Sequence, residues 1–251
     1  MKLTISRRLL ASSLAAGLAL ALAACSGTEE AEDALAGEPI AAIPAPDGQA
    51  WTDVVAVTPE DGYLVGNPNA PLKLVEYASH TCGACAHFSA NGSPPLKKEY
   101  VSTGVVSLEL RNLVRDPIDL TIAALVRCGQ PQNMQPLSEQ AWASLEAIFD
   151  NANRNGAALE AAAQLPPEQR FVGIAQATGL IDFFAARGLS SDQARTCLAD
   201  SAKIEALAAR SQQQATELGV SATPTFFLNG RKLDVNQWEA LEPILQNAGA
   251  R

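Results

Sequence analysis

The order of its elements predicts an α/β fold, with a central mixed β-sheet flanked by helices and interrupted by an all-helical insertion. Strand patterns lie in 51–116 and again in 218–251, whereas 117–217 is dominated by Ala, Leu, Glu and Gln with helical periodicity. Roughly 200 residues follow the N-terminal segment, which is enough for one domain with a substantial core. We therefore expect one domain whose two halves are separated by the insertion.

The first half is expected to hold three strands and one interrupted helix. The clearest strand is Leu72–Ala78, which is apolar on both faces apart from Lys73 and Glu76. A helix should begin close to Cys85 and be kinked or interrupted at Gly92–Pro95, because proline disrupts a helix interior. The other two strands are expected at Trp51–Val57 and Val105–Leu113.

The insertion and the second half carry further signals. Within the insertion, helical patterns punctuated by Gly and Pro lie at 118–128, 137–151, 168–177, 181–187 and 191–214. In the second half, Asn229-Gly230 is the strongest short signal for a hairpin turn, and it lies between 226–228 and 231–233. An amphipathic helix over 235–246 is expected to close the chain.

The N-terminus carries the features of an export signal. Three basic residues precede the apolar run Leu9–Ala24, which at roughly 16 residues is short for a bilayer span. The run ends in Leu22-Ala23-Ala24-Cys25, which resembles the motif at which bacterial lipoproteins are cleaved and lipidated. We therefore expect a lipoprotein signal peptide at 1–24 and lipidation of Cys25. The alternative is an ordinary cleaved signal in which Cys25 is incidental.

Negative charge is concentrated in the N-terminal part. The chain has 18 basic and 27 acidic residues, a formal net charge of −9, and nine of the acids lie in 26–72, which has no Lys or Arg. Residues 25–50 are rich in Ala, Glu, Pro and Gly, so a disordered acidic tether is expected there. The charge argues against nucleic-acid binding. The expected location is the periplasmic side of a bacterial membrane, with the lipid on Cys25 as the anchor.

Export changes how the cysteines are interpreted. The periplasm is kept oxidising, and apart from Cys25 the chain has four cysteines, enough for two disulfides. Cys128 and Cys197 fall in predicted helices of the insertion and show no second C-x-x-C spacing, so we expect them to form a structural disulfide. Cys82 and Cys85 form a C-x-x-C pair directly after a strand and at the start of a helix.

The position of the C-x-x-C pair favours redox chemistry. At a helix N-terminus the first sulfur meets unpaired backbone N–H groups and the positive end of the helix dipole, and both stabilise a thiolate. The thiolate is the species that attacks a disulfide. We therefore expect Cys82 to be the nucleophile. Cys85, one turn into the helix, is expected to be less exposed and to resolve the mixed disulfide.

With these residues in place, the sequence resembles the DsbA-like branch of the thioredoxin superfamily, in a lipoprotein form. The matching segments are Gly66–Pro71, Leu74–Ser79 and Thr81–Cys85, together with the distant segment Gly219–Gly230. The resemblance covers about 51–250, with all four matches inside it. It implies a thioredoxin-like fold and the activity of a thiol–disulfide oxidoreductase.

The resemblance also implies roles for particular residues. Thr223–Pro224 is expected to be a cis peptide bond that lies against the redox pair, where the Thr223 backbone binds substrate; a simple strand-entry proline is the alternative. Glu76 is expected to be buried beneath the redox pair and to transfer protons, because burial raises the pKa of a carboxyl group. An exposed glutamate at the strand end is the alternative. No cofactor is implied beyond the redox-active disulfide.

The two histidines, His80 and His87, flank the redox pair. His80 is a candidate for tuning the thiolate of Cys82, with an exposed loop position as the alternative, and for His87 an exposed helix position is favoured. Stronger oxidants of the family often carry a histidine between the cysteines, where this chain has Ala84. Alanine offers neither charge nor hydrogen bond, so we expect a less oxidising couple than that of the family's best-known member.

The expected partners are exported proteins with thiols or disulfides and a membrane redox partner. Oxidase activity is slightly favoured over reductase or isomerase activity, and a monomer is expected because the tether leaves no room for a dimerisation domain. No metal is expected under this interpretation. The alternative from another class is a copper- or zinc-binding lipoprotein, whose four ligands within eight residues would be His80, Cys82, Cys85 and His87.

Overall fold

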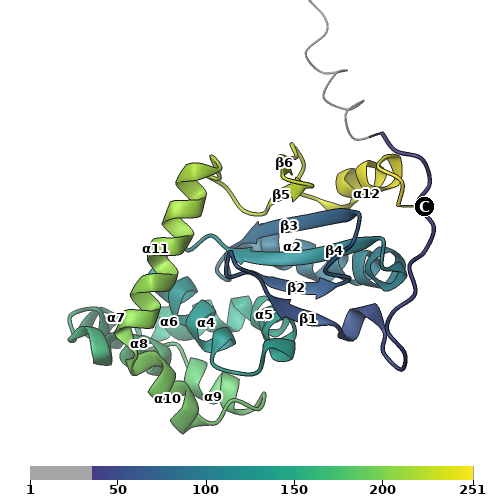
Figure 1. Ribbon diagram of the computed structural model, residues 1–251. Coiled ribbons are helices and arrows are strands. Elements are labelled where there is room, and N and C mark those ends of the chain that lie inside the picture. The colour runs from purple at the N-terminus through teal and green to yellow at the C-terminus, as the bar shows by residue number, and fades with distance from the viewer. Residues whose placement is uncertain (1–35, 251) are drawn as a thin grey trace, which may run out of the picture. The chain divides into compact units, whose positions relative to one another are not determined.

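The computed structural model describes residues 36–250, and a six-stranded mixed sheet lies at its centre (Figure 1). The strands follow the order β1-β2-β4-β3-β5-β6, in which β3 and β4 are parallel and all other neighbours are antiparallel. The predicted mixed sheet is confirmed. The strands are β1 (Val55–Val57), β2 (Tyr63–Gly66), β3 (Leu72–Ala78), β4 (Val106–Asn112), β5 (Thr225–Leu228) and β6 (Arg231–Lys232).

Strand β3 lies in the middle of the sheet and leads directly to the redox pair. Its bounds are those predicted, and all of its residues except Lys73 and Val75 are buried. In the register, Glu76 stands opposite Leu110 of β4 and Phe226 of β5. The one acidic side chain of β3 is therefore held between apolar neighbours on both adjacent strands.

The first hairpin of the sheet differs from the prediction. The strand expected at Trp51–Val57 is wrong in its first part, because Trp51–Asp53 forms a 3-10 turn (η1) and only Val55–Val57 pairs as β1. The indole of Trp51 explains this: it is buried and its Nε1 donates to Ile43 O at 2.7 Å, so a tertiary contact fixes the turn. Strand β2 was not predicted; its four residues are all buried, which leaves no alternation to detect.

Residues 36–50 lie against the domain. Gly37 N–H donates to Asn247 O at 2.8 Å, and Ile43 N–H donates to Thr103 O at 2.8 Å. The expectation of a disordered tether is therefore wrong for 36–50, where backbone hydrogen bonds compensate for the cost of ordering the segment. Outside the described residues lie the remainder of the tether, the predicted signal peptide and Cys25.

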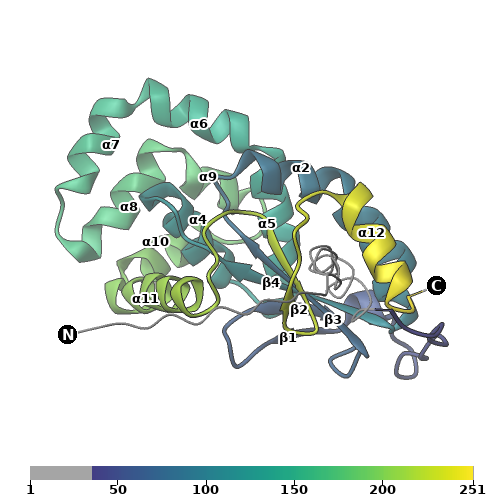
Figure 2. The ribbon, with the colours of Figure 1, turned by 90° about the horizontal axis from the view of Figure 1, so that it is seen from above.

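Helices α2 (Gly83–Asn91) and α12 (Trp238–Asn247) cover one face of the sheet (Figure 2). Phe88 of α2 packs on Phe226 of β5, with ring centroids 4.7 Å apart. The predicted interruption after α2 is present, since the chain changes helix type around its two prolines. The successive turns are α3 (Ser93–Pro95), the π-turn η2 (Leu96–Tyr100) and the 3-10 turn η3 (Val101–Thr103).

Strands β5 and β6 form the predicted hairpin. Asn229 and Gly230 occupy its turn with φ of 50° and 80°, the left-handed conformation that a type I′ turn requires at both positions. Asn229 Oδ1 also accepts a hydrogen bond from Lys73 N–H at 2.8 Å. This side-chain bond ties the hairpin to the start of β3 and keeps β5 next to it.

The predicted helical insertion is confirmed, and it lies to one side of the sheet (lower left in Figure 1). Two predicted helices are each broken in two, one at Ser144 and the other at Asp200. The Asp200 carboxylate caps the helix that follows it by accepting a hydrogen bond from Lys203 N–H. The helix over Gly156–Ala163 was not predicted, because its alanines form no distinct apolar stripe. The helices are α4 (Pro117–Arg127), η4 (Pro131–Asn133), α5 (Met134–Ala143), α6 (Leu145–Arg154), α7 (Gly156–Ala163), α8 (Pro167–Ala177), α9 (Leu180–Ala185), α10 (Ser191–Ala199) and α11 (Ser201–Glu217).

The main hydrophobic core lies between the insertion and the redox end of the sheet. Cys82 and Cys85 belong to the same buried cluster as Ile122 and Leu125 of α4 and Trp142 of α5. The insertion therefore packs directly against the two sulfur-bearing residues. The position of the insertion therefore helps to fix the positions of Cys82 and Cys85.

Candidate active site

Cys82 lies at the junction between β3 and α2. It is the N-cap residue of α2, and its Sγ accepts a hydrogen bond from Cys85 N–H at 3.4 Å. The side chain is mostly buried, with 5% of the residue exposed. Both cysteines are free thiols in this structure. The helix N-terminus predicted for the pair is thus present, and it directs a backbone N–H group at the first sulfur.

The pKa of the Cys82 thiol is lowered from its ordinary value of 9.0 to about 5. The largest cause is hydrogen bonding with the Cys85 side chain; burial opposes it, and the Thr223 side chain and the backbone N–H groups of Cys85 and Ala84 lower the pKa further. All of the favourable contributions come from groups that stabilise negative charge on Cys82 Sγ. Cys82 is therefore a thiolate near neutral pH and can attack a disulfide.

Cys85 has the opposite properties. It is fully buried, and the pKa of its thiol is raised by the hydrogen bond to Cys82, then by burial and by the nearby Glu76 carboxylate. A sulfur with a raised pKa takes up a proton when it leaves a disulfide. The pair therefore consists of one exchange-ready thiolate and one protonated thiol.

Glu76 is buried beside Cys85, as the resemblance implies. Only 5% of it is exposed, and burial raises the pKa of its carboxyl group from 4.5 to about 8. Lys97 opposes this shift, whereas Glu139 and Cys82 add to it. The exposed strand-end alternative is wrong. A carboxyl group that changes protonation near neutral pH can exchange a proton with Cys85.

Thr223 and Pro224 come from the loop before β5 and lie against Cys82. The Thr223–Pro224 peptide bond is cis, as expected from the resemblance. Cys82 Sγ lies 3.3 Å from Thr223 O, to which it donates a hydrogen bond when it is protonated. A segment separated from Cys82 by 141 positions thus places a backbone carbonyl next to the reactive sulfur.

A family model described as thioredoxin matches residues 58–247, the span that holds the C-x-x-C pair, Glu76 and Thr223–Pro224. The chain belongs to the thioredoxin family. A solved structure of a protein-disulfide isomerase from Novosphingobium aromaticivorans is 33% identical to it with a TM-score of 0.69, covering 74% of this chain and 96% of that one. The structure of Wolbachia pipientis alpha-DsbA1 has the same fold, with 22% identity, a TM-score of 0.61 and coverage of 76% and 92%.

The curated relatives of this thioredoxin-family chain are longer proteins. One from Rickettsia bellii, provisionally named a protein-disulfide oxidoreductase, is 24% identical over 171 residues, which make up 68% of this chain and 58% of the relative. The chain spans about half the length of the curated relatives it matches. Together the comparisons confirm the predicted thioredoxin-like fold and the resemblance to the DsbA-like oxidoreductases of the superfamily.

The loop before Cys82 is held by the helical insertion of this thioredoxin-family domain. His80 is fully buried: its N–H donates to Asp119 Oδ1 at 2.8 Å, its Nε2 lies 3.0 Å from Ser138 Oγ, and its ring stacks on Trp142. The exposed-loop alternative for His80 is therefore wrong. None of these partners is a sulfur atom, so an effect of His80 on Cys82 has to pass through the loop that it anchors.

The ligands proposed for a metal site do not converge. His80 faces the insertion, whereas His87 is exposed on α2 and contacts Asn91. Within 36–250 no group of three or more His, Cys, Asp and Glu side chains is arranged to hold a metal ion. The metal-binding alternative thus has no set of ligands in the described part of the chain.

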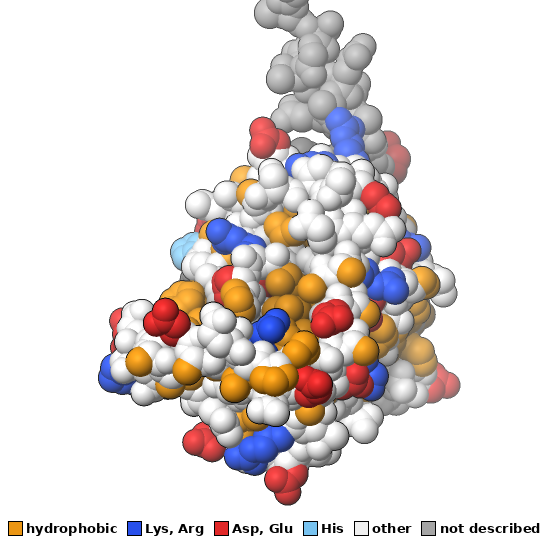
Figure 3. Space-filling view, turned by 90° about the vertical axis from the view of Figure 1, so that its left-hand side faces the viewer, with side chains coloured by type: hydrophobic (Ala, Val, Ile, Leu, Met, Phe, Trp, Pro, Cys, Tyr) orange, Lys and Arg blue, Asp and Glu red, His pale blue; other side chains and the backbone are white. Residues whose placement is uncertain are grey.

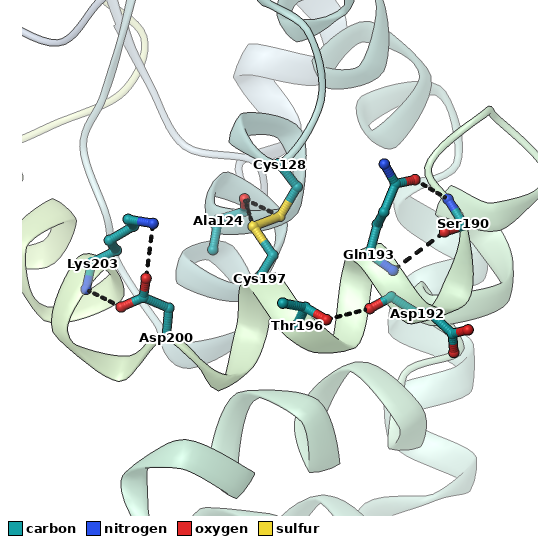
Figure 4. The surroundings of a disulfide bond; sticks show 9 residues. All are labelled: Ala124, Cys128, Ser190, Asp192, Gln193, Thr196, Cys197, Asp200 and Lys203. Carbon is teal, nitrogen blue, oxygen red and sulfur yellow. Dashed lines mark hydrogen bonds and ion pairs between the residues drawn. A yellow bond between two sulfur atoms is a disulfide. The ribbon is translucent and has the colours of Figure 1, made fainter.

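Cys128 and Cys197 are joined in a disulfide, the pairing that the sequence predicts (Figure 4). It links Cys128, just after α4, to Cys197 in the last turn of α10, with Cα atoms 6.0 Å apart and a sequence separation of 69. Its sulfur atoms lie near Ala124 O, at 3.2 Å and 3.9 Å. The disulfide fastens the last part of the insertion to its first helix.

Sequence reasoning missed the residues that surround the site from the insertion and the turn after α2. Lys97 and Glu139, which influence Glu76, are separated from it by 21 and 63 positions and belong to no motif. Asp119, Ser138 and Trp142 were likewise not singled out. The only local signal among them is Asp119, an acid in the first turn of a mostly apolar helix.

Figure 3 views the side of the molecule on which the insertion helices lie, at the left of Figure 1. Hydrophobic side chains gather in the middle of this face, with acidic and basic side chains around them. A hydrophobic surface surrounded by charged side chains can contact a polypeptide.

Among residues 36–250, no helix combines the length and apolar character needed to cross a bilayer.

Proposed function

We propose that this chain is a thiol–disulfide oxidoreductase that exchanges disulfides with exported proteins through Cys82 and Cys85. The observation that carries the proposal is the environment of Cys82. This residue is the N-cap of α2, the pKa of its thiol is about 5, and its Sγ lies 3.3 Å from Thr223 O. No cofactor beyond the Cys82–Cys85 disulfide is needed for this chemistry.

In the oxidising direction, a substrate thiolate attacks Cys82 Sγ of the Cys82–Cys85 disulfide. The S–S bond breaks, a mixed disulfide forms, and Cys85 leaves and takes up a proton. A second substrate thiolate then attacks the substrate sulfur of the mixed disulfide and releases Cys82 as a thiolate. Two electrons pass from the substrate dithiol to the enzyme disulfide. In this proposal the Thr223 backbone binds an extended substrate segment beside Cys82; the 3.3 Å between Thr223 O and Cys82 Sγ supports it.

The low pKa of Cys82 supports oxidation as the favoured direction. Between pH 5 and 9 the folded, reduced protein holds Cys82 as a thiolate, whereas the unfolded chain holds it as a thiol. The reduced folded form is therefore stabilised, and a couple with a stabilised reduced form oxidises its substrates. A membrane redox partner would then remove the two electrons and restore the disulfide.

The proposed setting is the periplasmic side of a bacterial membrane, with the chain anchored through lipid on Cys25. The supporting observations are the lipoprotein-like signal in the sequence and the presence of one redox pair and one structural disulfide, as suits an oxidising compartment. The proposed partners are exported thiol proteins, and the proposed state is a monomer. Labelled palmitate that enters the parent chain and not Cys25→Ala would check the anchor.

Mixed-disulfide trapping tests the activity. The oxidised protein should convert a reduced two-cysteine peptide to its disulfide. Cys85→Ser, given the disulfide form of the same peptide, should accumulate the Cys82–peptide mixed disulfide, because Cys82 still attacks the disulfide and the residue that resolves the adduct is gone. Cys82→Ser should neither exchange nor trap and is the matched control. Failure of the parent to exchange, together with no adduct on Cys85→Ser, would remove the proposed function.

We also expect an intermediate redox potential for the Cys82–Cys85 pair. Thioredoxin combines a thiol pKa of about 7 with about −270 mV, and DsbA combines about 3.5 with about −120 mV. A Cys82 pKa of about 5 then corresponds to roughly −180 mV. Equilibration with glutathione buffers at pH 7, followed by alkylation of the reduced pair, measures it. A value as high as about −120 mV would contradict the effect ascribed to Ala84.

A further inference from the structure

A small cavity lies next to Glu76, between the sheet, the end of α2 and α5. Its volume of about 10 Å³ is close to the minimum that accommodates one water molecule. Hydroxyl, amide and carboxyl groups line it, together with the apolar side chains of Leu108, Leu110 and Trp142; the polar lining residues are Glu76, Ser89, Ser93, Gln135 and Glu139. A cavity with this many polar groups is suited to a hydrogen-bonded water.

Glu76 itself supplies a second observation. Its Oε1 is buried and has no hydrogen-bond partner among the described residues. An unpaired buried oxygen is unfavourable unless a water or another donor satisfies it. Glu76 is also one of the residues that line the cavity, so a water there can serve as the partner.

The other acid of the cavity, Glu139, connects it to the surface. The Glu139 side chain is 37% exposed, accepts a hydrogen bond from Ser93 Oγ at 3.2 Å and forms an ion pair with Lys97. Lys97 is itself partly exposed. The lining of the cavity thus includes one buried carboxyl group and one carboxylate in contact with solvent.

We propose that Glu139 is the proton relay of this site, passing protons between solvent and Glu76 through one water in the cavity. The proposal rests on the proposed function and adds a residue of the insertion to it. When Cys85 leaves the disulfide, Glu76 gives it a proton and becomes a carboxylate. Glu139 then takes up a proton from solvent and passes it through the water to Glu76, which leaves Glu139 a carboxylate again. In the reverse direction the same groups carry the proton from Cys85 to solvent.

The charged groups around Glu76 determine how the relay can be tested. Lys97 lowers the pKa of Glu76, whereas Glu139 and Cys82 raise it, and Glu76 in turn raises the pKa of Cys85. Removing the charge of Glu139 therefore shifts the pH at which Glu76 titrates. A purely electrostatic role would move the midpoint of a rate–pH profile and leave its plateau unchanged. Loss of a relay lowers the plateau.

The rate–pH profile is measured by single-turnover reduction of the full oxidised chain by a two-cysteine peptide. The reaction is run at several pH values from 5 to 9, and each time point is quenched with acid. We expect Glu139→Gln to lower the plateau at least ten-fold while the melting temperature stays near that of the parent. Glu139→Asp should recover most of the rate, because it restores a carboxylate. Glu139→Ala should recover rate when acetate is added, since acetate can replace the missing group.

Glu146→Gln is the matched control, because it makes the same change at an exposed glutamate with no hydrogen bond or ion pair given by the structure. A plateau within two-fold of the parent in Glu139→Gln overturns the relay. So does an equal loss in Glu146→Gln, or a loss in Glu139→Ala that acetate does not restore. If the parent itself does not oxidise the peptide, the proposed function fails instead of the relay.

Discussion

Glu76→Gln is expected to stabilise the reduced form of the protein, by an amount that grows as the pH rises. Burial raises the pKa of Glu76 from 4.5 in its ordinary state to about 8 in the folded chain. Between these values the folded protein keeps a proton that the unfolded chain has released, so the free energy of unfolding falls with increasing pH. Each pKa unit corresponds to about 1.4 kcal/mol, and the full loss is roughly 4 to 5 kcal/mol above pH 8.

Glutamine has nearly the shape of the protonated acid and does not titrate, so this loss should be absent in Glu76→Gln. Urea unfolding at several pH values between 4 and 9 would measure the difference between variant and parent. It should be small near pH 4 and reach several kcal/mol above pH 8. Glu146→Gln changes an exposed glutamate and should show no such trend. A difference between Glu76→Gln and the parent that is constant with pH would contradict the burial argument.

The same burial that destabilises the fold supplies the chemistry of the site. In water a glutamate is ionised at neutral pH and has no proton to give to Cys85. Glu76, held in β3 between Leu110 and Phe226, can keep its proton at neutral pH. Stability is thus exchanged for a proton donor next to a buried sulfur, a trade-off common at active sites.

The parts of the site that lie close together in the sequence could be predicted from it. Strand β3, the helix that begins after Cys82 and the Asn229-Gly230 turn depend on local pattern and turn chemistry, and all three are present. Glu76 could be identified because a single acid interrupts an apolar strand. Thr223–Pro224 could be placed only through resemblance to a family.

The remaining parts depend on contacts between distant segments. Ser138 reaches His80 across 58 positions, and Trp142 Nε1 donates to Ser79 O across 63. The pairing of Lys97 with Glu139 spans 42 positions. No periodicity in one sequence indicates which helix of an insertion will lie against which loop. For the same reason the order of 36–50 was missed, since it depends on contacts with Asn247 and Thr103.

The two cysteine pairs differ in their positions relative to helix dipoles. Cys82 lies at the N-terminus of α2, where a thiolate is stabilised. Cys128 follows the last residue of α4 and Cys197 lies in the last turn of α10, both next to Ala124 O. A helix C-terminus disfavours negative charge, so these sulfurs are poor leaving groups and their disulfide should resist reduction. This difference in position makes the Cys82–Cys85 pair exchangeable and the Cys128–Cys197 pair stable.

Removal of the stable pair in Cys128→Ala/Cys197→Ala is expected to lower the free energy of unfolding by about 4 kcal/mol. The disulfide closes a loop with a sequence separation of 69, and opening a loop of that length returns roughly this much entropy to the unfolded chain. For a domain of this size the melting temperature should fall by roughly 8 to 16 °C. The loop before Cys82 should keep its structure, because its partners Asp119, Ser138 and Trp142 lie on α4 and α5.

Measurement in a Cys82→Ala/Cys85→Ala background isolates the effect, since only the Cys128–Cys197 bond can then respond to a reductant. Dithiothreitol should destabilise this background protein by the same 4 kcal/mol or so. It should have no effect on the chain in which Cys82, Cys85, Cys128 and Cys197 are all replaced by alanine. If the loss is below about 1 kcal/mol, the contacts between α4 and α10 alone hold the insertion closed, and the disulfide contributes little to the fold. A loss of the expected size means that the end of the insertion depends on this bond.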